Sequence, residues 1–129
     1  MMEVMSEATT IILPNERPKS WNAFWAGSHW SKRKEERDRV HLVVRASINP
    51  DKTKIYQGRV DIKITAFYDT TGRNKQIESP NVCNKPYIDA LIGWYLTDDG
   101  TDYVRRVITE SRIDDVNPRV EIEIIPVGE

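Results

Sequence analysis

The chain has 129 residues, of which 39% are hydrophobic and 30% are charged, and its formal net charge is −1. This size and balance predict one globular domain over residues 1–129 and exclude a long repeat array. No apolar run approaches the roughly 18 residues of a membrane span, and the start lacks the pattern of a signal peptide. We therefore expect a cytoplasmic protein without membrane contact, with residues 1–8 flexible.

The first half of the chain predicts a strand, a loop and a charged helix. Residues 9–13 are a β-branched run that stops at a proline, which is typical of a short strand. A loop-like stretch follows. Over residues 31–48 apolar side chains recur at helical spacing, Ser31 can cap the first turn, and an Asn-Pro pair ends the pattern.

The second half predicts one further helix and three strands. Residues 59–68 alternate apolar and polar side chains and form the clearest strand. Residues 85–95 predict a helix, and residues 103–112 and 119–127 predict two strands after a turn at 97–100. The order β-α-β-α-β-β predicts an α+β domain, in which two main helices pack on a small mixed sheet of about four strands.

The charges are distributed unevenly along the chain. Residues 17–45 contain eight basic and three acidic residues, whereas residues 98–129 contain nine acidic residues and four arginines. Such asymmetry suits a protein that binds phosphates with one region and uses carboxylates in another. The alternative is a helix whose mixed charges only face solvent.

One segment carries residues suited to phosphate chemistry. On a helix Lys85 and Asp89 share a face, and Asp98 and Asp99 follow its end. Adjacent carboxylates offer the oxygen ligands that Mg²⁺ prefers, and a nearby lysine can neutralise charge that develops on a phosphate. The simpler interpretation is an i,i+4 ion pair followed by an Asp-Asp-Gly turn.

This segment resembles the RusA-type Holliday junction resolvases, small dimeric Mg²⁺-dependent endonucleases that cut four-way DNA junctions. Their core has the pattern Asp-x-Asp-Asn-x-x-Lys-x-x-x-Asp-Ala-Leu, followed after a short helix by Asp-Asp. Here the run from Lys85 to Leu91 (KPYIDAL) matches the middle, and Asp98 and Asp99 match the closing pair. Asn22 and Trp25, ahead of the basic helix, and the final strands also agree in order, so the resemblance covers most of residues 9–127.

The resemblance fails at the two leading aspartates of the pattern. Ser79 and Asn81 stand in their places, and Val82 replaces the following asparagine. Neither replacement brings a negative charge, which should weaken Mg²⁺ binding because charge count is a main determinant of affinity for such ions. Glu78 could reach the site only if the loop is shifted.

The resemblance implies a role for each matching position. Asp99 would ligate Mg²⁺ or Mn²⁺ with Asp98 beside it, Asn81 and Ser79 would occupy the other ligand positions, and Lys85 would face the scissile phosphate. The basic helix would contact the DNA backbone through five residues: Lys32, Arg33, Lys34, Arg37 and Arg45. A homodimer is expected because a four-way junction has two-fold symmetry.

Two other hypotheses about the function stay open. The chain can be a protein of the same fold that binds branched DNA without cutting it, as Ser79 and Asn81 suggest. It can also be a small structural domain with no role in nucleic-acid binding, since its net charge of −1 is low for a DNA-binding protein.

The remaining aromatic, histidine and cysteine residues give weaker signals. Trp21, Trp25 and Trp30 lie beside the basic run and can stack on unpaired bases, or serve as core or dimer contacts. His29 and His41 have no second ligand at short spacing, so we expect no zinc site. Cys83 has no partner for a disulfide and no nearby histidine motif, so a catalytic thiol is not expected.

Overall fold

The computed structural model of the chain describes residues 7–25, 30–70 and 76–128. Its elements, in chain order, are β1 (Thr9–Pro14), α1 (Trp21–Trp25), α2 (Trp30–Ala46), the 3-10 turn η1 (Pro50–Lys52), β2 (Val60–Tyr68), the 3-10 turn η2 (Ser79–Asn81), α3 (Lys85–Asp89), β3 (Val104–Ile113) and β4 (Arg119–Pro126). His29 and most of residues 1–8 lie outside the described residues.

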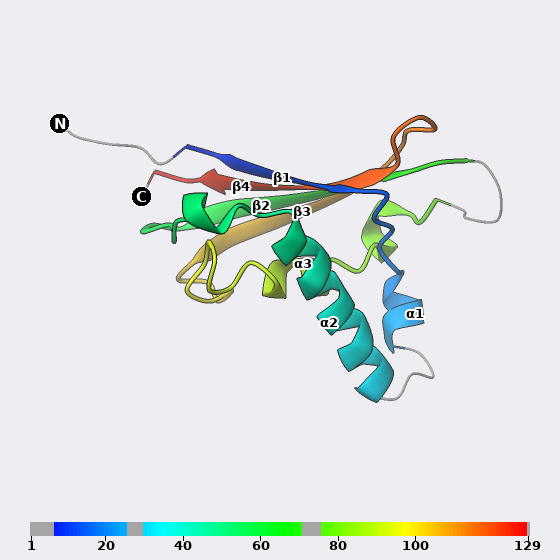
Figure 1. Cartoon of the computed structure of the whole chain (residues 1–129), viewed down its shortest axis with the longest axis horizontal. Helices are drawn as coiled ribbons and strands as arrows, with labels where there is room; N and C mark the ends of the chain where they lie inside the picture. Colours follow the sequence, from blue (N-terminus) through cyan, green and yellow to red (C-terminus); the bar gives the residue numbers. More distant parts are fainter. Residues whose placement is uncertain (1–6, 26–29, 71–75, 129) are drawn as a thin grey trace.

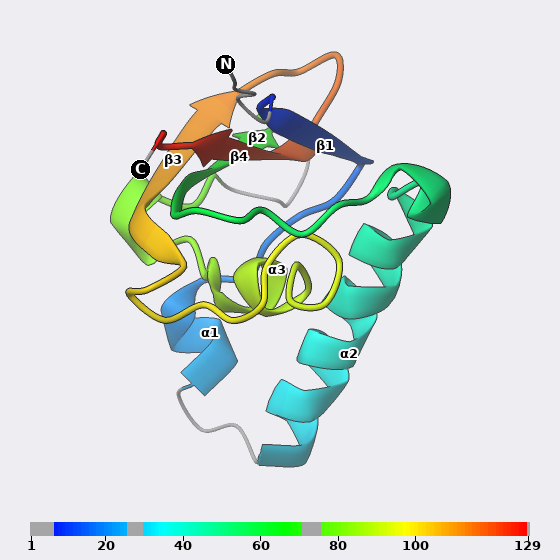
Figure 2. The same cartoon turned by 90° about the vertical axis from the view of Figure 1, so that its left-hand side faces the viewer.

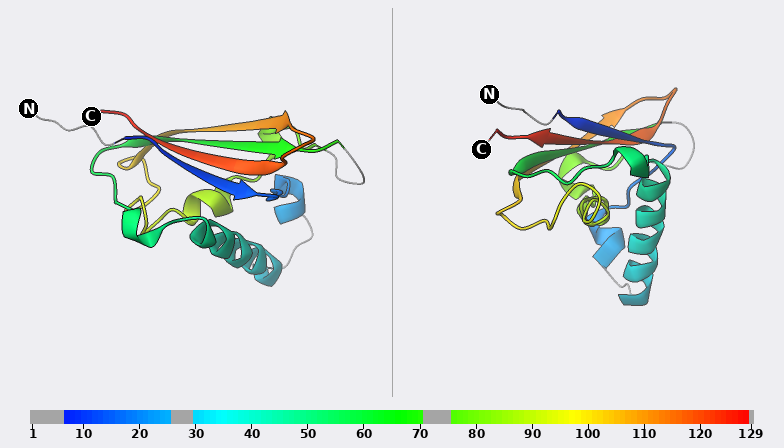
Figure 3. Two further views of the ribbon diagram at one scale, coloured as in Figure 1. Left: turned by 45° about the horizontal axis from the view of Figure 1, so that its top comes forward. Right: turned by 60° about the vertical axis from the view of Figure 1, so that its left-hand side comes forward.

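The four strands form one mixed sheet in the order β1-β4-β2-β3. β4 lies antiparallel to both β1 and β2, whereas β3 runs parallel to β2. Parallel neighbours need a long crossover connection, and the chain between β2 and β3 provides it and carries α3. The three α-helices lie on the same face of the sheet (Figures 1 and 3). These observations confirm the predicted α+β fold with a small mixed sheet.

The core lies between that face and the helices. The predicted apolar side of β2 is buried throughout: Val60, Ile62, Ile64, Ala66 and Tyr68. α2 contributes Val40 and Val44, which are fully buried. Each buried valine or isoleucine among them stabilises the fold by about 1.5–3 kcal/mol relative to exposure. The helical periodicity of α2 and the alternation of β2 therefore meet in one hydrophobic core.

The helix predicted over residues 85–95 is wrong in its second half, because α3 ends at Asp89. Beyond it the chain makes a tight loop in which Gly93 has a φ of 90°, a conformation that glycine adopts without steric cost. The N–H of Gly93 donates to the carbonyl of Leu96 at 2.8 Å. This loop turns Leu91 and Leu96 into the core, and their burial replaces the helical packing that periodicity predicted.

The short helix α1 occupies part of the stretch expected to be a loop. The Ser20 hydroxyl accepts a hydrogen bond from the N–H of Ala23 at 3.0 Å, which is the interaction of a serine N-cap. Phe24 is its buried residue. α1 therefore packs one aromatic ring inward and lies beside the start of α2 (Figure 2).

Candidate functional site

Lys85, the first residue of α3, lies between two carboxylates. Its Nζ is 3.2 Å from Oδ1 of Asp89, one helical turn on, and 3.6 Å from Oδ2 of Asp99. The start of the helix is fixed to the sheet because the side-chain amide of Asn84 donates to the Thr109 hydroxyl of β3 at 2.8 Å. The tertiary fold thus brings Asp99 to Lys85 from the loop that follows α3.

The charge on Lys85 is set by competing effects. Partial burial lowers the pKa of Lys85, but the hydrogen bonds and charges of Asp89 and Asp99 together outweigh it and raise that pKa above its ordinary value. Lys85 is therefore an ammonium at neutral pH. It can stabilise an anion such as a phosphate, and it cannot act as a general base.

The two residues that replace the leading aspartates make contacts away from Lys85. The Ser79 hydroxyl accepts a hydrogen bond from the backbone N–H of Ser111 in β3 at 2.8 Å. The Asn81 amide donates to Oε2 of Glu78 at 3.5 Å. Within the described ranges, no hydrogen bond or ion pair joins either residue to Asp99. Ser79 therefore satisfies an amide of β3, a strand at the edge of the sheet.

Whether a divalent cation could bind near Lys85 depends on the carboxylates available there. Among the residues that the structure describes, no group of three or more His, Cys, Asp or Glu side chains could hold a metal. Two carboxylates, Asp89 and Asp99, do converge on Lys85, and Mg²⁺ is commonly held by one or two carboxylates together with substrate phosphates. The structure thus provides two carboxylates that share Lys85 as their ion-pair partner, whereas Asp98 is exposed.

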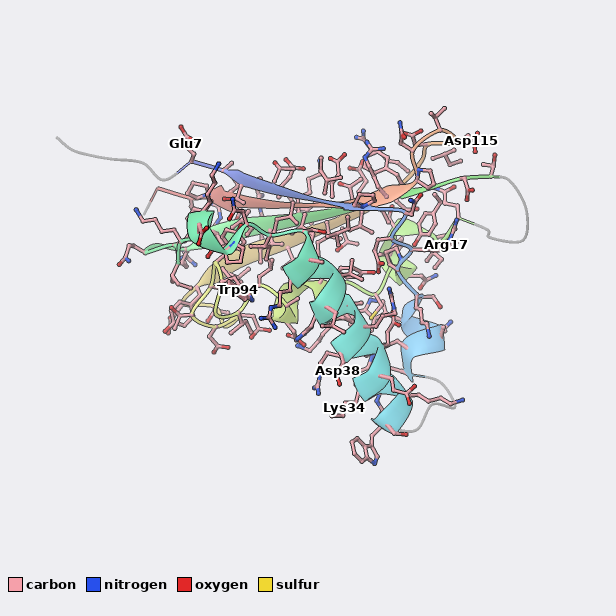
Figure 4. All side chains as sticks on the ribbon, in the orientation of Figure 1. Glu7, Arg17, Lys34, Asp38, Trp94 and Asp115 are labelled. Atoms are coloured by element: carbon pink, nitrogen blue, oxygen red, sulfur yellow. The ribbon has the colours of Figure 1, made fainter. Side chains whose placement is uncertain are left out.

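Three of the five predicted DNA-contacting residues line a pocket with Lys85. This pocket of about 370 Å³ lies between α1, α2 and α3, and nine residues line it: Phe24, Trp25, Trp30, Arg33, Lys34, Arg37, Lys85, Pro86 and Asp89. Lys34 lies 2.8 Å from Asp38, its neighbour one turn along α2 (Figure 4). The pocket therefore lies between the basic face of α2 and Lys85 with its partner Asp89.

The other two predicted DNA contacts lie to either side of this pocket. Lys32 lines a smaller hollow of about 220 Å³ together with Lys19 and Glu36. Arg45 lines a groove of about 450 Å³ that runs between α2 and the loop after α3 and includes Trp94. Basic side chains are thus exposed along much of α2.

A partly buried ionic network, in which the Arg39 side chain is 43% exposed and the Glu16 side chain 5%, joins α2 to α3. Arg39 donates to both carboxylate oxygens of Glu16, at 3.0 and 2.8 Å, and to both oxygens of Glu36. The Tyr87 hydroxyl of α3 donates to Oε2 of Glu16 at 2.6 Å. Burial, with the neighbouring Glu16 carboxylate, raises the pKa of Tyr87. The network therefore links α2, α3 and the segment after β1, and α2 and α3 are two of the three helices that line the 370 Å³ pocket.

Sequence reasoning missed this network and the apolar part of the pocket. Glu16 and Tyr87 are 71 residues apart, so no local pattern reports their contact. The sequence does contain a pattern that predicts one wall of the pocket. Relative to Trp30, three basic residues follow at spacings of three, four and seven and therefore share its helical face: Arg33, Lys34 and Arg37.

Cys83 is buried, and burial raises the pKa of its thiol to about 11. Little thiolate, the nucleophilic form, therefore exists at neutral pH. His41 lines the 450 Å³ groove that also contains Asp38 and Arg45 and that shares Asp89 with the 370 Å³ pocket. In the described part of the chain, no helix combines the length and apolar character needed to cross a membrane.

Neither models of known protein families nor curated proteins match this chain.

Proposed function

We propose that this chain is a RusA-like, structure-selective DNA endonuclease, which resolves four-way junctions as a homodimer during recombination or repair. The observation that carries the proposal is the convergence of Lys85, Asp89 and Asp99 in and beside a basic pocket. An ammonium, a pair of carboxylates and an adjoining basic helix are what a protein needs to bind a phosphodiester and promote its hydrolysis.

Each group has a distinct role in this proposal. Arg33, Lys34 and Arg37 bind backbone phosphates, and Lys85 stabilises negative charge on the phosphate that is cut. Asp99 and Asp89 would hold Mg²⁺ or Mn²⁺, which when bound activates water for attack on phosphorus. In the hydrolysis, the attacking water loses a proton to solvent as its oxygen forms a bond to phosphorus, the P–O bond to the leaving sugar oxygen breaks, and that sugar oxygen takes a proton from solvent.

A second candidate is a RusA-like protein that binds branched DNA without cutting it. It is favoured by Ser79, whose hydroxyl is committed to the Ser111 amide and which adds no charge near Asp99. Both candidates predict binding that weakens as salt rises, because phosphate contacts release counterions. Only the endonuclease predicts nicks that depend on a divalent metal.

The test is cleavage of an end-labelled synthetic four-way junction with Mg²⁺, with Mn²⁺ and with chelator. We expect symmetric nicks by the native chain that disappear in Asp99→Asn. The matched control is Asp102→Asn, which removes the same charge from an exposed position in the same loop and should cut normally. A Ser79→Asp/Asn81→Asp variant restores the missing carboxylates, and an aspartate at 79 can still accept from Ser111.

The outcomes separate the candidates. Metal-dependent nicking by the native chain supports the endonuclease. If the native chain binds the junction and only the doubly substituted variant cuts it, the protein is a binder. If no variant binds or cuts, both proposals are wrong.

A further inference from the structure

The 370 Å³ pocket between the helices combines an aromatic wall with a cationic rim. Four of its residues are apolar, namely Phe24, Trp25, Trp30 and Pro86, and five are charged, namely Arg33, Lys34, Arg37, Lys85 and Asp89. Its volume is within the range of about 300–1,000 Å³ that small-molecule sites occupy. A pocket of this composition fits a flat ring that is attached to a negatively charged group.

The two tryptophans of the pocket are not core residues. The exposed fraction is 51% for Trp25 and 69% for Trp30, although tryptophan is usually well buried. Trp25 is nevertheless held in place: the Phe24 ring meets it edge-on at 5.4 Å between centroids, and the Arg33 guanidinium lies 4.7 Å from its ring centre. The exposed aromatic surface is therefore arranged within the pocket, as a stacking surface requires.

The charges of the pocket select an anion. Four cations and one carboxylate line it, and two further carboxylates, Asp38 and Asp99, pair with cations of the rim, which leaves an excess of one positive charge. Lys34 and Lys85 are both about half exposed, and they can move from their carboxylate partners to a phosphate oxygen. Stacking on aromatic rings beside cations that follow a phosphate backbone is how proteins bind single-stranded nucleic acid.

We propose that this pocket binds an unpaired nucleobase of the DNA, stacked on Trp25 and Trp30, while Arg37 and Lys85 contact the phosphates on either side. A base within a duplex has both faces covered by its neighbours, so only an unpaired or flipped base can enter. The inference rests on the proposed DNA binding. It specifies the part of the DNA that the pocket binds, namely an unpaired base next to the phosphate at Lys85. The pocket thus recognises a branch point or single-stranded segment rather than continuous duplex.

The test separates base binding from phosphate binding. Affinity is measured by fluorescence anisotropy for a labelled oligothymidylate and for an abasic strand of equal length, which has the same phosphates and no bases. Stacking of one base predicts that the native chain prefers the oligothymidylate by about five- to 150-fold. Trp30→Ala should remove most of that preference and leave the affinity for the abasic strand unchanged.

Two further variants act as controls. Trp30→Phe keeps a ring and should retain part of the preference. Val116→Ala removes an exposed apolar side chain, 83% exposed, from the connection between β3 and β4, away from the pocket, and should behave like the native chain. Far-ultraviolet circular dichroism of each variant establishes that the fold is intact, and the exposure of Trp30 makes its truncation mild.

The results decide between base binding and other roles of the pocket. Equal affinity for the two strands, or a preference that Trp30→Ala leaves intact, overturns the inference. It is also overturned if sedimentation shows a dimer that Trp30→Ala dissociates while base preference is absent, since the tryptophans would then contact a second copy. Base preference without junction cleavage supports the pocket and counts against the endonuclease, so the two proposals fail separately.

Discussion

The substitution Tyr87→Phe removes one hydroxyl and directly tests the ionic network of Glu16, Glu36 and Arg39. This hydroxyl donates at 2.6 Å to Glu16, whose side chain is only 5% exposed. A hydrogen bond to a charged group contributes about 1.5–3 kcal/mol, and its loss leaves an acceptor less satisfied in a buried site. Because Arg39 still donates two hydrogen bonds to Glu16, we expect the lower end, a loss of about 1.5 kcal/mol in the free energy of unfolding.

The assay is urea unfolding at neutral pH, followed by tryptophan fluorescence and by circular dichroism. The expected result is a lower midpoint with an unchanged m-value, which indicates lost stability without a change in the surface exposed on unfolding. Tyr103→Phe is the matched control, since the structure gives the hydroxyl of this half-buried residue no hydrogen bond within the described residues. A loss below about 0.5 kcal/mol for Tyr87→Phe, the range of neutral surface substitutions, would refute the reasoning.

Three further predictions follow from contacts of single groups. The difference in unfolding free energy between the native chain and Tyr87→Phe should shrink above pH 10. The pKa of Tyr87 is raised in the folded state, so the tyrosine of the unfolded chain ionises first; the contribution of its hydroxyl is present below pH 10 and is lost as pH rises. Urea titrations at pH 8 and 11 measure this, and equal differences at the two pH values would contradict it. Cys83 should react with iodoacetamide at pH 8 far more slowly in the folded chain than in the unfolded chain, because burial shields the thiol and raises its pKa to about 11. Mass spectrometry measures the two rates, and equal rates would show that the thiol is accessible in the folded chain. Ser79→Ala should cost about 1 kcal/mol, since the Ser111 N–H loses its acceptor; urea unfolding measures this, and an unchanged midpoint would mean that water replaces the hydroxyl without loss.

The fold could be predicted from the sequence where the spacing of apolar residues in a segment matches the side of that segment that is buried in the structure. β2 alternates along its whole length, and every residue of its predicted apolar side is buried. The bounds of all four strands and of α2 lie within about two residues of the predicted bounds, the usual scatter at element ends. The order of elements was enough to derive an α+β domain with a mixed sheet.

Local patterns failed where a distant partner competes with the helix. Residues 85–95 have helical spacing, but Gly93 lets the chain turn, and burial of Leu91 and Leu96 in the core stabilises the turned form. The same limit applies to Ser79. Its residue type indicated a lost carboxylate, whereas its contact with Ser111, 32 residues away, depends on β3 lying at the sheet edge.

For the candidate site, the sequence by itself determined the chemical groups and part of their spacing. One turn of helix joins Lys85 to Asp89, and successive turns of α2 join Trp30 to Arg33 and Arg37. The tertiary structure alone decided that Asp99 returns to Lys85, and that α1 and α3 complete the pocket beside α2. The physical reason is range: helix and strand geometry fixes neighbours within a few residues, whereas contacts between separate segments follow from how their apolar faces pack into one core.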